Sequence, residues 1–177
     1  VISHYQLKNE FHLFSSSLGS TLLIDSLQRR EIHAKSSLFV APNEHFKLPL
    51  WSRIIIKLPL PIVVLKLMRS ITLRAIERKV KEEGQRVRYR RALMEQELVR
   101  WRASARSLIA YSLPDDLSNI SVPCGILAAQ SDKLHAMDAA KSIAARIPGA
   151  VMIEVPSNQY AHEADVLVEV EAFHASL

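Results

Sequence analysis

The chain has little cysteine and little glycine. Cys124 is its single cysteine, so an internal disulfide and a cysteine-built zinc site are both excluded. The apolar segment around Cys124 predicts a small, buried residue. Glycine occurs at four of 177 positions, which is few for a fold rich in turns. Several histidines show no spacing typical of a metal site, namely His4, His33, His45, His135 and His174.

Long uninterrupted apolar runs are also missing. The most apolar stretch covers residues 54–68, but Pro59 and Pro61 break it and two lysines interrupt it. A membrane-spanning helix needs about 20 apolar residues, so this stretch is too short to be one. The apolar fraction of 49% and the charged fraction of 23% are those of an ordinary globular domain.

A serine-rich turn near the N-terminus is the most informative feature present. An apolar run ends in Ser15, Ser16 and Ser17, Gly19 follows, and a helix-compatible segment comes next. This order is typical of the strand-to-helix turn that presents a nucleophilic serine. The residues two before and two after the nucleophile must be small, as Ser15 and Gly19 are. The backbone N–H of Leu18 would then be one oxyanion donor. The alternative is a serine-rich loop after a strand.

The C-terminal third predicts alternating strands and helices. Residues 120–129 are typical of a buried strand, and Asp132 follows in a turn. Residues 138–147 favour a helix and 150–155 a second strand, after which a polar loop carries His162. A closing helix is expected over 163–176, with one apolar stripe made of Val166, Val170, Phe173 and Leu177.

Residues 120–177 resemble the C-terminal end of the α/β-hydrolase superfamily, and residues 9–41 resemble its nucleophile strand, helix and next strand, the last at 35–41. The resemblance implies a partial α/β-hydrolase fold, a mostly parallel sheet flanked by helices. It also implies that Ser17 is the nucleophile, Asp132 the acid and His162 the general base.

Three residues depart from the family's pattern of glycines. Ser15 replaces the first glycine of the turn, Ala129 stands three residues before the acid, and Ala161 directly precedes the histidine. All three replacements are small. Asp138 and Asp165 are rival acids, but both lie in predicted helices, and His12 lies in the strand before the turn and is interpreted as structural.

The middle of the chain predicts helices rather than a sheet, so three parts are expected: residues 1–41, a helical cap or lid insertion at 42–116, and residues 117–177. Positive charge is concentrated in the insertion, because residues 69–106 hold twelve Lys or Arg against five Glu. An apolar stripe predicts one long helix, with Gly84 separating it from the preceding helix; the stripe comprises Met94, Leu98, Trp101, Ala105 and Leu108.

Two interpretations of residues 46–106 stay open, a cap that lines an acyl pocket and a face that rests on a membrane surface. The usual interpretation of the charge run is a solvated outer face, and the functional alternatives are attraction to anionic lipid or to an anionic acyl substrate. Binding to nucleic acid ranks last, because no nucleic-acid motif accompanies the arginines at 86–91.

The sequence therefore predicts a serine hydrolase that acts on carboxylic esters or thioesters with an apolar part. A catalytically inactive binding protein and an acyltransferase on the same fold are the alternatives. The triad needs no metal or organic cofactor, so none is expected. The serine turn falls within the first twenty residues, so we expect the chain to be the C-terminal portion of a longer protein. A cytoplasmic location is expected, with contact at the periphery of a membrane as an option.

Overall fold

The computed structural model describes residues 11–46, 50–129 and 137–177, and the chain divides into two compact units. The core unit comprises Val1–Glu44 and Leu113–Leu177, and the inserted unit comprises His45–Ser112. Each unit is described by itself below.

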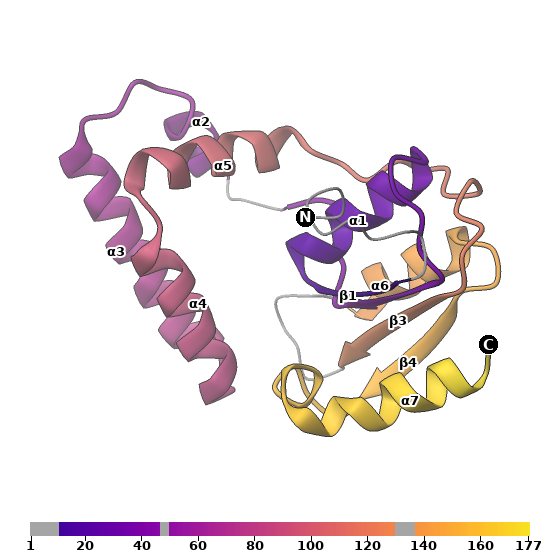
Figure 1. Ribbon diagram of the computed structural model, residues 1–177. Coiled ribbons are helices and arrows are strands. Elements are labelled where there is room, and N and C mark those ends of the chain that lie inside the picture. The colour runs from indigo at the N-terminus through magenta and orange to yellow at the C-terminus, as the bar shows by residue number, and fades with distance from the viewer. Residues whose placement is uncertain (1–10, 47–49, 130–136) are drawn as a thin grey trace. The chain divides into compact units, whose positions relative to one another are not determined.

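The core unit is built on a sheet of four strands (Figure 1). The strand order is β1-β2-β3-β4, and each neighbouring pair is parallel. The strands are β1 (His12–Ser16), β2 (Ser36–Val40), β3 (Cys124–Ala129) and β4 (Val151–Val155). Because parallel strands end at one edge of the sheet, the segments that follow them lie along that edge. The strand predicted from residue 120 begins later, at Cys124, directly after Pro123.

Helices cover both faces of this sheet (Figure 1). On one face, Phe39 and Ile126 are buried against α1 (Leu18–Gln28) and α6 (Met137–Arg146). On the other face, Leu38 and Leu127 are buried with residues of η2 (Ala164–Val166) and α7 (Leu167–Ala175). The fold class predicted from the sequence, a mostly parallel sheet flanked by helices, is confirmed.

Gly125 sets how closely α7 can approach the central strands. A Cβ at this position would lie 2.5 Å from Leu38 Cδ2 and 3.3 Å from Phe173 Cδ2. The shorter contact would oblige the end of the Leu38 side chain to shift, so glycine lets Leu38 and Phe173 keep their positions over β3. This glycine therefore serves packing rather than a turn.

The closing segment differs from its prediction at both ends. It starts as two short 3₁₀ turns, η1 (Tyr160–His162) and η2, before α7 begins at Leu167. Val166 and Phe173 of the predicted stripe are buried, but Leu177 is 58% exposed because α7 ends at Ala175. The prediction that Leu177 belongs to the buried stripe was therefore wrong.

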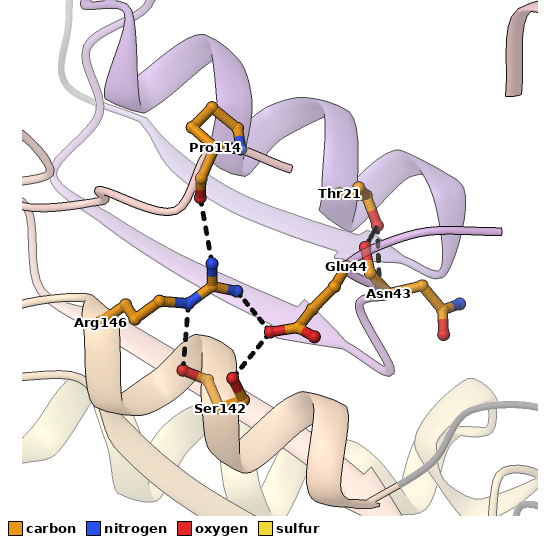
Figure 2. Close-up of polar contacts among 6 residues, drawn as sticks. All are labelled: Thr21, Asn43, Glu44, Pro114, Ser142 and Arg146. Carbon is orange, nitrogen blue, oxygen red and sulfur yellow. Dashed lines mark hydrogen bonds and ion pairs between the residues drawn. The ribbon is translucent and has the colours of Figure 1, made fainter. Parts of the chain in front are cut away.

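Arg146 of α6 holds both points where the chain leaves and re-enters the core unit (Figure 2). Its guanidinium pairs with Glu44 at 2.6 Å and donates to the Pro114 carbonyl at 3.1 Å. Ser142 donates to the same Glu44 oxygen at 2.7 Å, and Leu113 N–H donates to the Glu44 carbonyl at 2.8 Å. The two crossing segments are therefore fixed to each other and to α6.

We expect Arg146→Met to lower the free energy of unfolding by about 1.5–3 kcal/mol, because charged hydrogen bonds of a half-buried group are lost. Urea denaturation of the folded protein measures this loss. Arg29→Met is the matched control, since its pair with Asp25 spans one helical turn and carries only a few tenths of a kcal/mol. Equal stability of the two variants would contradict the role given to Arg146.

The described part of the inserted unit consists of helices and the segments that connect them, with one isolated bridge between His45 and Ser112. Pro61 caps α3, as expected for a proline that ends the preceding segment. The helices are α2 (Leu50–Ile55), α3 (Ile62–Lys79), α4 (Glu83–Glu95) and α5 (Leu98–Ala110). No helix among the described residues is long and apolar enough to cross a membrane.

Two expectations for this unit were wrong. Gly84 lies inside the first turn of α4, and the chain instead breaks at Val80, whose backbone is extended. The single long helix is two helices, because Gln96 and Glu97 both adopt extended backbone. Neither residue is a glycine or a proline, so the sequence carries no strong signal for this break.

Candidate active site

Ser17 occupies a strained turn between β1 and α1. Its backbone has φ 53° and ψ −119°, a combination that non-glycine residues rarely adopt and that costs of the order of 1–3 kcal/mol. Two hydrogen bonds hold the strain in place: Ser17 N–H donates to the Val40 carbonyl at 2.8 Å, and the Ser17 carbonyl accepts from Thr21 N–H at 3.1 Å. The first of these ties the turn to the end of β2.

The small residues around Ser17 face each other, as the turn requires. A Cβ placed on Gly19 would lie 4.0 Å from Ser15 Cβ, an ordinary van der Waals contact. Ser15 Oγ donates to Ser20 Oγ at 3.2 Å, and Ser20 Oγ donates to the Val40 carbonyl at 3.1 Å. The serine that departs from the family's glycine is therefore accommodated by a hydrogen-bonded chain.

His162 is presented by the polar loop after β4. Ser157 Oγ accepts from Tyr160 N–H at 3.0 Å, and the Gln159 carbonyl accepts from His162 N–H at 2.9 Å, which closes the tight turn η1. Ala161, the residue that departs from glycine here, is buried in the same core cluster as Phe173 of α7. The His162 side chain itself is exposed.

The loop brings His162 to the end of β1, 146 residues away in the chain. His162 Nε2 lies 2.7 Å from Ser16 Oγ, and Nδ1 lies 2.7 Å from the Asn158 carbonyl oxygen. Ser16 and Ser17 are thus two adjacent hydroxyl-bearing residues at the edge of the sheet where the His162 ring lies. Sequence reasoning selected Ser17 and did not single out Ser16, because its contact with His162 joins residues that are 146 apart in the chain.

The remaining predicted site residues have different outcomes. Asp132 lies outside the described residues, so its role as the triad acid stays a prediction. Leu18 is the first residue of α1, where backbone N–H groups lack helical acceptors, and its role as oxyanion donor also stays a prediction. Ala129 is the last residue of β3 and is buried.

The rival residues have structural surroundings. His12 is the first residue of β1, where Nδ1 lies 2.7 Å from Ser36 Oγ and the ring stands 4.3 Å from that of His174. Asp138 lies in the first turn of α6 and Asp165 in η2, and both are exposed. No group of three or more metal-ligating side chains occurs within the described ranges.

Cys124 is buried in the first position of β3, as its sequence context predicted. Burial raises the pKa of its thiol to about 12, because the thiolate would lose its hydration there. At neutral pH this group is an inert thiol and is not a rival nucleophile.

Comparison with known proteins shows a likeness in structure alone. No family model matches the chain, and no curated protein matches it in sequence. A hydrolase from Pseudomonas aeruginosa PA01 matches 97% of this chain over 67% of its own length, with 17% identity and a TM-score of 0.70.

Two esterases match comparably well. The esterase from Exiguobacterium antarcticum has 15% identity and a TM-score of 0.74, over 99% of this chain and 70% of its own. A thermophilic esterase from Thermogutta terrifontis has 12% identity and a TM-score of 0.72, over 98% and 69%. The chain thus spans about two thirds of these proteins. Together with the strained serine turn and the parallel sheet, these likenesses show that the chain has the fold of the α/β-hydrolase superfamily.

Proposed function

We propose that this protein is a serine hydrolase that cleaves carboxylic esters or thioesters through an acyl-enzyme on Ser17. The observation that carries the proposal is the strained backbone of Ser17 at a strand-to-helix turn, with an imidazole at the same edge of the sheet. Strain of this kind persists only where the surrounding structure enforces it, and it concentrates at active sites. The esterases of the same fold support the assignment.

The proposed reaction begins with attack of Ser17 Oγ on the acyl carbon. The hydroxyl proton passes to His162 Nε2, and the negative charge on the carbonyl oxygen is stabilised by the Leu18 N–H. The protonated imidazole then gives its proton to the departing alcohol or thiol. Water, deprotonated by the same imidazole, attacks the ester on Ser17; the acyl–oxygen bond breaks, Ser17 Oγ takes the proton back from the imidazole, and the acid leaves. Asp132 would orient the imidazole and stabilise its charged form.

An apolar acyl or alcohol part is proposed because the inserted unit is rich in apolar residues. We expect kcat/KM of the full-length protein to rise along a series of esters from acetate to octanoate. The rise should approach about fourfold for each methylene that the site buries. A series without any dependence on chain length would refute the apolar pocket while leaving ester hydrolysis intact.

Product analysis separates hydrolysis from acyl transfer, which shares the triad. Added alcohols would divert the acyl group into new esters if the protein were an acyltransferase, whereas a hydrolase releases mainly the free acid. A folded protein that neither hydrolyses esters nor reacts with a serine-directed phosphonate would instead favour the inactive binding protein.

Contact of the inserted unit with a membrane surface stays a prediction, as does a cytoplasmic location with contact at the membrane periphery. Val63, Leu67 and Ile71 recur at intervals of four on α3 and are all exposed. Exposed Lys66 and Arg74 flank them, and no acidic residue occurs between Glu44 and Glu77. Co-sedimentation with anionic but not with neutral vesicles would support this contact.

A further inference from the structure

A pocket of about 360 Å³ opens at the edge of the sheet where the strands begin. Its lining comes from residues 27–33, which lead from the end of α1 toward β2, and from residues 118–122, which lead into β3. Ser17 and His162 follow the carboxyl ends of β1 and β4, so they lie at the opposite edge. The strands between the two edges are five or six residues long, which is about 16–20 Å. The pocket is therefore separate from the candidate active site, and its volume is in the range of small-ligand sites.

The base of the pocket is apolar and continuous with the core. Leu27 and Ile120 line it while being 4% and 1% exposed, and both belong to the core cluster shared with α1 and α6. Half-buried Ile32 and Val122 also line it and pack against the same cluster. An apolar chain that enters the pocket would therefore leave water along these four side chains.

The rim of the pocket is polar and carries positive charge. Arg30 and His33 line it, and the other polar lining residues are neutral, namely Ser118, Asn119 and Ser121. No acidic residue lines the pocket in the described parts of the chain. The lining therefore favours a ligand that is negatively charged at one end and apolar at the other.

Arg30 is held at the rim by a neutral partner. Its guanidinium donates to Asn119 Oδ1 at 3.2 Å, and Asn119 is tied to the end of α1 because its N–H donates to Gln28 Oε1 at 3.1 Å. No carboxylate pairs with Arg30 among the described residues. A guanidinium has five N–H donors, and a carboxylate can accept two of them side by side.

The backbone of Arg30 is strained in a way that glycine would avoid. Its φ is 58°, its N–H donates to the Leu27 carbonyl at 3.0 Å, and Glu31 N–H donates to the Ser26 carbonyl at 2.9 Å. This is the helix ending in which a left-handed residue, most often glycine, follows the last turn. An arginine there costs stability, because its Cβ disfavours that conformation. Such strain concentrates at ligand sites, so it supports a binding role for the side chain.

We propose that this pocket binds a small carboxylic acid in its ionised form, with the carboxylate on Arg30 and an apolar chain over Leu27 and Ile120. His33 supplies a further hydrogen-bond donor at the rim. A chain is required as well as a charge, because an inorganic anion would leave the apolar base in contact with water. The proposal goes beyond the proposed function and does not depend on it, since no residue of the pocket takes part in that reaction.

The experiment is an NMR titration of the ¹⁵N-labelled full-length protein with hexanoate, acetate and hexanol. Hexanoate should cause saturable shifts of the amides of residues 30–33 and 118–122. Acetate should bind more weakly, by about fourfold for each methylene that the pocket buries. Hexanol should bind at least about tenfold more weakly than hexanoate, because it lacks the charge that pairs with Arg30. Shifts confined to amides beside Ser17, no saturable shift, or hexanol as tight as hexanoate would each overturn the proposal.

Arg30→Gly tests the arginine without endangering the fold. Hexanoate should bind to it about tenfold or more weakly than to the parent, because the charged hydrogen bonds are lost. Its resistance to urea should not fall, since glycine relieves the strain at φ 58°. Arg29→Gln is the matched control, because Arg29 is the neighbouring positive charge, pairs with Asp25 and does not line the pocket. Its affinity should stay within about twofold of the parent. Equal affinities of the two variants would overturn the proposal.

Discussion

Replacing Ser17 with alanine should lower ester hydrolysis by the full-length protein at least about a thousandfold. The nucleophile is lost, and any residual rate comes from binding and the oxyanion site alone. Steady-state hydrolysis of a chromogenic ester measures the loss. The substitution leaves the backbone and the hydrogen bond from Ser17 N–H to Val40 in place, so the variant should remain folded.

Ser16→Ala is the control for this result, because it removes the adjacent hydroxyl from the same turn. We expect it to lose far less activity than Ser17→Ala, since Ser16 does not form the acyl bond. Ser17→Gly should lose as much activity as Ser17→Ala but be more stable by about 1 kcal/mol, because glycine adopts a φ of 53° without strain. Greater loss of activity in Ser16→Ala than in Ser17→Ala would exchange the roles of the two serines.

The second large effect is expected at His162. His162→Gln keeps a polar side chain of similar reach but cannot take up a proton, so kcat/KM should fall about 10²- to 10⁴-fold. Steady-state rates of ester hydrolysis measure the fall.

His174→Gln is the matched control. His174 lies on α7, its ring contacts that of His12 on β1, and it takes no part in the proposed reaction. Its rate should stay within about twofold of the parent. A similar fall in both variants would mean that His162 contributes through stability rather than through proton transfer.

Periodicity and turn chemistry predicted the core unit well from the sequence. Apolar segments followed by turns located all four strands, and the departure of Ser17 from strand geometry was expected from Ser15 and Gly19 alone. These features are local, because a strand's burial and a turn's small neighbours are both written in adjacent residues. The residue at which a strand begins was predicted less well. β3 begins at Cys124, after Pro123, whereas the prediction began at residue 120.

What the sequence could not supply depends on contacts between distant segments. The contact of His162 with Ser16 joins residues 146 apart, and nothing local distinguishes Ser16 from its neighbours. The Arg146 anchor likewise depends on Glu44 and Pro114 meeting at α6. In the inserted unit, the apolar stripe continues across Gln96 and Glu97, where the helix ends without a glycine or a proline. The periodicity therefore predicted one helix where the structure has two, α4 and α5.

The central claim is that Ser17 is an activated nucleophile. Its most direct test is to treat the full-length protein with a fluorophosphonate and locate the adduct by mass spectrometry of the peptide that contains residues 11–28. We predict one adduct, on Ser17, which disappears in Ser17→Ala and forms more slowly in His162→Gln and in Asp132→Asn. An adduct on Ser16, or a folded protein that carries none, would contradict the claim.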